Sequence, residues 1–246
     1  MKSKSKRGSH VGLVLSFVIF VAFLIFLYSI LEPLVRIQQD KQALLSNLKI
    51  SLKEKFSSDL DIITIVIEEN AIEDCIKLEG LNEIEIESGT INSHIIVKNE
   101  SGGTLNIRRD NEDLFIERPD NNNIFFKIYQ SDEFDEIIEG ALDNCGKIGD
   151  DDYSIESIIT RDEIFQEKIN KTKIKYETHY EDLKTELKIP VGSEFGFSFT
   201  DKEKIIIETT EKEKATSTSV YAEEISILYV DEEANINSGF IIIKVW

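Results

Sequence analysis

The stretch that decides the fold is VGLVLSFVIFVAFLIFLYSIL, Val11–Leu31, which lies close behind the start of the chain. It belongs to a longer run, Gly8–Leu31, that carries no formal charge. At about 1.5 Å per residue, its 21 residues make a helix of roughly 31 Å, which matches a bilayer core of about 30 Å. A helix satisfies its own backbone hydrogen bonds, so one that is apolar on every face suits lipid. The sequence therefore predicts a transmembrane helix over 11–31.

The charges on either side of this run predict its orientation. Residues 1–10 contain four Lys/Arg and no acid, and Glu32 follows the run directly. The positive-inside rule then makes residues 1–10 a cytoplasmic basic tail and places the rest of the chain outside. A cleaved secretory signal is the alternative, but its apolar region is about 7–15 residues long and ends at a small-residue site. An interfacial helix would need a polar face. We expect an uncleaved, single-pass anchor in the cell membrane, with the lipid bilayer as its partner.

The outer part of the chain is strongly acidic. Residues 1–56 hold nine Lys/Arg and three Asp/Glu, a net charge of +6 against −19 for the whole chain, which leaves −25 on residues 57–246. This charge argues against nucleic acid as a partner and against docking on anionic lipid. The sequence also has none of the catalytic, cofactor or metal-ligand motifs with recognisable spacing. We expect no enzymatic activity, no cofactor and no metal.

An amphipathic helix is predicted to continue from the membrane span over 32–56. Pro33 offers a position for a kink, because proline interrupts the helical hydrogen bonds. Most spacings in the stripe are three or four residues, which is typical of one helix face. The stripe comprises Leu34, Ile37, Lys41, Leu44, Leu45, Leu48, Leu52 and Phe56. Leaving it in water is unfavourable, so it packs either on the ectodomain or on neighbouring subunits. We expect helix-to-helix packing between subunits, and hence a homo-oligomer formed through the N-terminal helix.

Residues 57–246 are predicted to form one acidic, β-rich extracytoplasmic domain. Apolar residues alternate from Ile63 onward and again from Phe195 to the C-terminus, which is typical of short antiparallel strands. Between these regions, residues 162–188 show apolar steps of four and three, which predict one long helix. Phe195, Phe197 and Phe199 share one face of a strand and could be a binding platform, although core packing fits their spacing better. The fold class is α+β, with an N-terminal transmembrane helix that continues into an amphipathic helix.

Two cysteines and two glycosylation sequons are the candidate modification sites. Cys75 and Cys145 could form a disulfide in an oxidising exterior, or could be two buried apolar side chains. Asn99 and Asn170 begin N-x-S/T sequons, and Asn99 lies in a predicted turn. The acidic stretch 143–152 lacks the residue order of an EF-hand loop, so we interpret it as a solvated loop.

Lys6-Arg7-Gly8 followed by a long apolar helix resembles the N-terminal signal of archaeal type IV pilin-like proteins and Tad-type pseudopilins. The amphipathic continuation to Phe56 and a β-rich head also resemble the pilin layout. This resemblance implies cleavage near the basic-Gly junction by a prepilin peptidase, and a helix that anchors the subunit or packs in a filament. Many pilins carry Glu five residues after the cleavage point, where this sequence has Leu13.

Together these features predict a membrane-anchored surface protein with a structural or adhesive, pilin-like role. The alternative is an anchored binding or accessory domain that does not polymerise. An anchored enzyme whose site the sequence does not reveal is a third hypothesis. Processing of the N-terminus distinguishes the first two.

Overall fold

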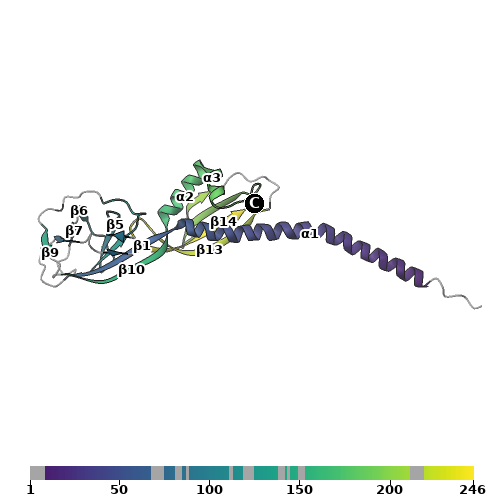
Figure 1. Ribbon diagram of the computed structural model, residues 1–246, viewed down its shortest axis with the longest axis horizontal. Helices are drawn as coiled ribbons and strands as arrows, with labels where there is room; N and C mark the ends of the chain where they lie inside the picture. The colour runs from purple at the N-terminus through teal and green to yellow at the C-terminus, as the bar shows by residue number, and fades with distance from the viewer. Residues whose placement is uncertain are drawn as a thin grey trace, which may run out of the picture.

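A computed structural model shows how the chain is arranged around one long helix (Figure 1). It describes residues 9–67, 75–80, 85–86, 89–110, 113–118, 125–137, 142, 145–148, 153–210 and 219–246. Of the acidic stretch 143–152, residues 143–144 and 149–152 lie outside the described residues, as do the loop 211–218 and residues 1–8 of the basic tail. The long helix extends from one end of an elongated domain, residues 57–246, which packs on its C-terminal part and extends beyond it (Figure 1). We keep for this domain the name ectodomain, after its predicted location.

Helix α1 spans Ser9–Phe56, so the predicted span and the predicted stalk form one continuous element of 48 residues. Its axis bends near the middle of its length (Figure 1), and Pro33 lies in that part of the helix. A proline kink is the physical explanation for such a bend. Strand β1, Ser57–Ile67, begins at the residue after the helix ends, so no connecting loop separates the helix from the ectodomain sheet.

The main sheet has eight strands in the order β12-β11-β14-β13-β10-β1-β8-β5. Every neighbouring pair in it is antiparallel except β10 and β13. The remaining strands of this sheet are β5 (Ile95–Asn99), β8 (Phe125–Gln130), β10 (Tyr153–Phe165), β11 (Phe195–Asp201), β12 (Ile206–Thr210), β13 (Tyr221–Val230) and β14 (Ile236–Val245). The fold is therefore α+β with a large, mainly antiparallel sheet and one apolar N-terminal helix.

A second sheet of four strands, in the order β6-β7-β2-β9, covers the end of the ectodomain far from the membrane span (Figure 1). Its strands are β2 (Cys75–Leu78), β6 (Ile107–Asp110), β7 (Asp113–Glu117) and β9 (Gly146–Ile148). Strands β3 (Glu85–Ile86) and β4 (Gly89–Thr90) pair in antiparallel fashion as a separate two-stranded sheet. Buried side chains of β2 and β7 share one apolar cluster with those of β1, β5 and β8. We call the four-stranded sheet, together with the strands β1, β5 and β8 that share this cluster, the distal half.

The half nearer the span, which we call the proximal half, packs helices on the sheet. Helices α2 (Gln166–Thr178) and α3 (Tyr180–Glu186) lie with the end of α1 against β11, β13 and β14. Phe195, Phe197 and Phe199 are all fully buried here, so they belong to the core and not to a surface platform. The ring of Phe197 lies 5.4 Å from the ring of Phe56 at the end of α1.

The single helix predicted over 162–188 is wrong in two respects. Residues up to Phe165 belong to β10, where Ser57 pairs with Ile164, so strand pairing overrides the helical pattern. The helical part is divided at His179, whose backbone leaves the helical region at φ −136° and ψ 51°. The predicted apolar face is nevertheless buried, from Ile169 in α2 through Leu183 in α3 to Leu187.

Strand β10 has a partner along one edge and almost none along the other. It pairs with β1 over nearly its whole length, but with β13 only at Ile164↔Tyr229 and Phe165↔Val230. Among the described residues, no other strand pairs with this second edge. Three isoleucines of the strand are 37–42% exposed, namely Ile155, Ile158 and Ile159. The middle of the molecule therefore presents an apolar strand edge.

Candidate functional site

The first part of α1 presents apolar side chains to its surroundings on every face. Val11–Glu32 is the only described helix segment long and apolar enough to cross a membrane, and none of it is buried within the protein. These properties fit a membrane span, and a signal sequence near the N-terminus shares them.

The second part of α1 is a core helix of the ectodomain. Leu48, Leu52 and Phe56 are at most 1% exposed, and Leu44 and Leu45 are at most 9% exposed. Their neighbours in the cluster come from α2, α3, β11, β13 and β14. An ion pair lies beside this contact, in which the Lys49 Nζ atom is 2.7 Å from the Oε1 atom of Glu223 in β13. The apolar N-terminal segment and the ectodomain are thus joined by packing along several helical turns.

This packing corrects the expected role of the stripe. We expected the stripe from Leu44 to Phe56 to pack against sister helices, and the structure covers it with the chain's own sheet and helices. The covering strands follow about 140 residues or more after the helix in sequence, so sequence distance gave no sign of them. The surfaces of α1 that remain exposed for contacts between subunits are the apolar segment Val11–Glu32 and the faces of the helix opposite the buried stripe.

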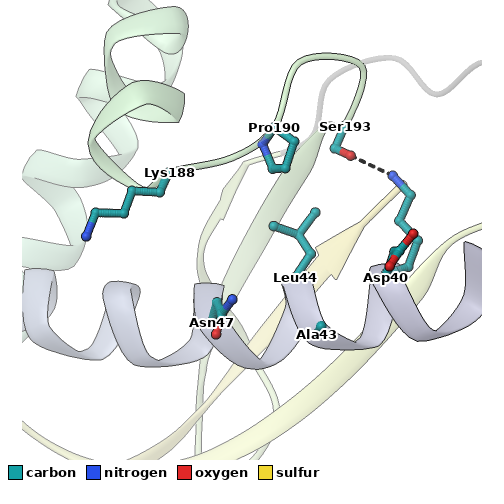
Figure 2. A pocket seen from close by; sticks show the side chains of 8 residues that line it. Asp40, Ala43, Leu44, Asn47, Lys188, Pro190 and Ser193 are labelled. Carbon is teal, nitrogen blue, oxygen red and sulfur yellow. Dashed lines mark hydrogen bonds between the residues drawn. The ribbon is translucent and has the colours of Figure 1, made fainter.

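A groove of about 500 Å³ lies where α1 meets the loop that precedes β11 (Figure 2). One wall is α1, with Asp40, Ala43, Leu44 and Asn47, and the opposite wall is the segment from Lys188 to Ser193. Asp40 lies eight residues beyond Glu32, the last residue of the apolar segment Val11–Glu32. The groove therefore lies roughly 12 Å along the helix from the end of this apolar segment, at about 1.5 Å per residue.

Lys41 closes one end of this groove by bridging two parts of the chain. Its Nζ atom donates to Ser193 Oγ at 2.8 Å and to the backbone oxygen of Trp246 at 3.1 Å. The backbone of Trp246 also exchanges two hydrogen bonds with Glu194. Lys41 is the one charged residue in the predicted apolar stripe, and this irregularity was the only sequence signal for the contact. The hydrogen bonds of Lys41 therefore join α1 to the loop before β11 and to Trp246, the residue after β14.

Two polar clusters join the helices of the proximal half to one another and to the residue before β11. Lys175 of α2 and Lys55 of α1 both bond to Glu186 of α3, and these hydrogen bonds lower the pKa of Glu186 to about 2. Burial raises the pKa of the Tyr180 hydroxyl far above its usual range, and its hydrogen bond to Glu194 acts in the same direction. A phenol that stays protonated is a permanent hydrogen-bond donor, so this cluster is a structural tie.

Metal-binding and histidine chemistry find little support in the described part of the chain. No group of three His, Cys, Asp or Glu there could hold a metal ion. The Nδ1 atom of His94 lies 2.8 Å from the backbone oxygen of Phe134, and His179 contacts Thr178 at the break between α2 and α3. These two histidines therefore serve local contacts.

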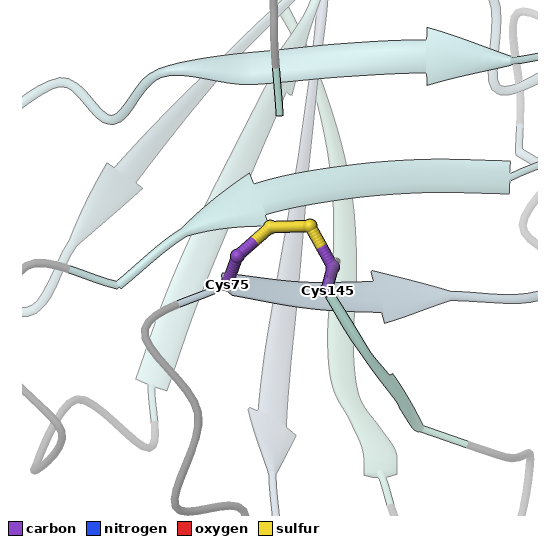
Figure 3. The surroundings of a disulfide bond; sticks show 2 residues. All are labelled: Cys75 and Cys145. Carbon is purple, nitrogen blue, oxygen red and sulfur yellow. A yellow bond between two sulfur atoms is a disulfide. The ribbon is translucent and has the colours of Figure 1, made fainter. Parts of the chain in front are cut away.

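The structure joins Cys75 and Cys145, the predicted pair, in a disulfide (Figure 3). Their Cα atoms are 4.6 Å apart, and the bond closes a sequence separation of 70 residues. Cys75 begins β2 and Cys145 immediately precedes β9, and these two strands pair in parallel from Ile76↔Gly146. The bond therefore fastens the edge strand of the four-stranded sheet to its neighbour.

The two sequons lie in different local structures. Asn99 ends β5, and its Oδ1 atom accepts hydrogen bonds from Ser101 and from the backbone of Gly103 in an exposed turn. Asn170 lies within α2, where the hydroxyl of Thr172 is buried and bonded to the Lys168 carbonyl. A glycosylating enzyme requires an accessible sequon, so Asn99 is the better acceptor of the two in the folded protein.

Comparisons with known proteins add no family to this description. No family model, no curated protein and no solved structure matches the chain.

Proposed function

We propose that this chain is a single-pass membrane-anchored surface protein with a structural or adhesive, pilin-like role. Its N-terminus lies in the cytoplasm, and residues 57–246 lie outside as a domain without enzymatic activity. The observation that carries the proposal is the continuity of α1, Ser9–Phe56, from the exposed apolar segment into the ectodomain core. At about 1.5 Å per residue its 48 residues extend about 72 Å.

A continuous helix between the apolar segment and the ectodomain fits a mechanical role better than it fits an enzyme tethered to the membrane. A flexible linker would let an ectodomain rotate freely above the membrane, whereas here β1 begins directly after the last helical residue. The helix end is also held by the buried stripe and by the Lys49–Glu223 and Lys55–Glu186 ion pairs. Force applied to the distal half would therefore pass into the anchor through packed structure.

Two further observations favour contacts with other molecules. The exposed edge of β10, with Ile155, Ile158 and Ile159, has the form to which an added strand binds in β-augmentation. The groove beside Lys41 lies close to the membrane and favours the second candidate function, an anchored accessory domain that holds a membrane partner. In that alternative the protein does not polymerise.

Processing of the N-terminus tests the pilin-like role. We expect the mature protein, isolated from its own cell envelope, to begin near Gly8, because Lys6-Arg7-Gly8 resembles a prepilin cleavage junction. Mass spectrometry of the N-terminal peptide measures this, and electron microscopy of the cell surface looks for filaments labelled by an antibody to the ectodomain. An intact Met1 together with a dispersed, non-filamentous label would contradict the pilin-like role and support the accessory domain.

Protease treatment of intact cells tests the orientation. External protease should digest residues beyond 56 and spare an epitope attached to the N-terminus, because the basic tail favours the cytoplasmic side. The epitope should become sensitive only after detergent is added. Digestion of the N-terminal epitope in intact cells, with a protected C-terminal domain, would reverse the proposed orientation.

A further inference from the structure

Lys98 is a buried lysine whose closest polar contact in the structure is an amide. It lies on β5 and is 5% exposed, and its Nζ atom is 2.5 Å from Oδ1 of Asn235. Asn235 lies 137 residues later, in the turn between β13 and β14. The contact therefore joins an edge strand of the distal half to the hairpin of the proximal half.

Burial works against the charged form of Lys98, whereas the groups around it favour the charge. The ring of Tyr129 lies 5.7 Å from Nζ, and the turn that carries Asn235 is fixed in a small apolar cluster through Val230 and Ala234. Burial lowers the pKa of Lys98, although Asp231 and Glu233 nearby oppose this shift. A lysine with a lowered pKa has more of the unprotonated form, which is the nucleophilic form of an amine.

A carboxylate lies beside the amide nitrogen of Asn235. Asp231 Oδ2 accepts a hydrogen bond from Asn235 Nδ2 at 3.1 Å. The other oxygen, Oδ1, accepts from the backbone N–H groups of Asn235 at 2.8 Å and of Glu233 at 3.0 Å. These bonds hold the carboxylate beside Asn235 Nδ2. The Nδ2 atom is the leaving group if the amide is attacked.

The amine lies close to the amide carbon that it would attack. An amide C=O bond is about 1.23 Å long, so an Nζ atom 2.5 Å from Oδ1 lies at most about 3.7 Å from Cγ. Reacting atoms in a near-attack arrangement are about 3–3.5 Å apart. Lys98, Asn235 and Asp231 thus bring together a nucleophile, an electrophile and a proton carrier.

We propose that Lys98 and Asn235 form an intramolecular amide bond with the help of Asp231. The Nζ–Cγ bond forms and the Cγ–Nδ2 bond breaks. A proton from Nζ passes through the Asp231 carboxylate to Nδ2, and one molecule of ammonia leaves. Nothing is oxidised or reduced, so the step needs no cofactor. The product is a covalent tie between β5 and the β13–β14 turn, which would couple the two halves of the ectodomain.

Intact-mass spectrometry of the full chain in detergent, after reduction and denaturation, tests this proposal. We expect wild-type protein to be lighter by one ammonia molecule than its sequence mass, which is calculated from the N-terminus that peptide mapping finds. Tandem spectrometry should find the tryptic peptides containing Lys98 and Asn235 joined. Lys98→Met and Asn235→Ala should each restore the sequence mass, and Asp231→Asn should reduce the joined fraction at least tenfold at equal time after synthesis.

A matched variant controls for general effects of substitution. Lys127→Met removes the lysine directly opposite Lys98 on β8 and should keep the joined peptide. A succinimide at Asn235 would also release ammonia, but it would persist in Lys98→Met. A folded wild-type protein that keeps its full sequence mass, or a deficit that persists in Lys98→Met, would overturn the proposal.

Discussion

Replacing Leu48 by Asp is expected to unfold the proximal half of the ectodomain. Leu48 is fully buried within the cluster that α1 shares with α2, α3, β11, β13 and β14. Truncating a buried Leu to Ala costs about 2–5 kcal/mol, and an unpaired buried carboxylate adds a desolvation penalty. We expect the free energy of unfolding to fall by more than about 3 kcal/mol. Thermal unfolding of the full chain in detergent, followed by near-ultraviolet circular dichroism, measures the loss.

Ile50→Asp is the matched control for this substitution. Ile50 lies two residues further along the same helix and is 58% exposed, so the same new charge meets water there. It should leave the melting temperature nearly unchanged. Both variants should remain in the membrane fraction, because both positions lie beyond Glu32. A Leu48→Asp protein with wild-type melting that has lost crosslinks between subunits would restore the expected packing between sister helices.

The stripe on α1 illustrates what helical periodicity can predict. Spacings of three and four residues identified the buried face from Leu44 to Phe56, because side chains at these spacings lie on one side of a helix. Periodicity does not identify the partner of that face. The strands that cover it, β11, β13 and β14, were each predicted as strands, but no local pattern shows which helix a sheet packs against.

Strand β10 was missed for a specific reason. Its register with β1 shifts between Thr64 and Ile65, whose partners are Ser157 and Ile155. Glu156 is therefore the additional residue of a β-bulge, and a bulge breaks the alternation of buried and exposed side chains. The isoleucines at 155, 158 and 159 consequently do not follow a period of two. The helical pattern predicted from Asp162 onward then obscured the end of the strand.

The long-range contacts of the candidate sites were hardest to predict. A chain with two cysteines allows one intramolecular pairing, so Cys75 and Cys145 could be named together from sequence. With 22 lysines, nothing local distinguishes Lys98, whose partner lies 137 residues away. Lys41 stood out only because it interrupts an apolar stripe, and its partner Trp246 is 205 residues distant. Such pairs depend on the complete topology.

Removing the disulfide is expected to loosen the distal half and leave the proximal half folded. The bond closes a separation of 70 residues, and the chain-entropy model gives a stabilisation of about 4 kcal/mol for a loop of this size. The two strands that the disulfide joins are short, with four residues in β2 and three in β9. Short strands at a sheet edge have few hydrogen bonds of their own to replace the covalent link.

Hydrogen exchange of the full chain in detergent, read by mass spectrometry, measures this effect where it occurs. In the double variant Cys75→Ser/Cys145→Ser, which leaves no free thiol, peptides covering β2 and β9 should exchange much faster than in wild type. Peptides covering α2 and β11 should be unchanged, because their core is built from different residues. Wild-type protein treated with a reductant should reproduce the pattern of the double variant. Equal exchange at β2 and β9 in all three samples would mean that packing of Ile76 and Leu78 holds the distal sheet without the bond, since both side chains are fully buried.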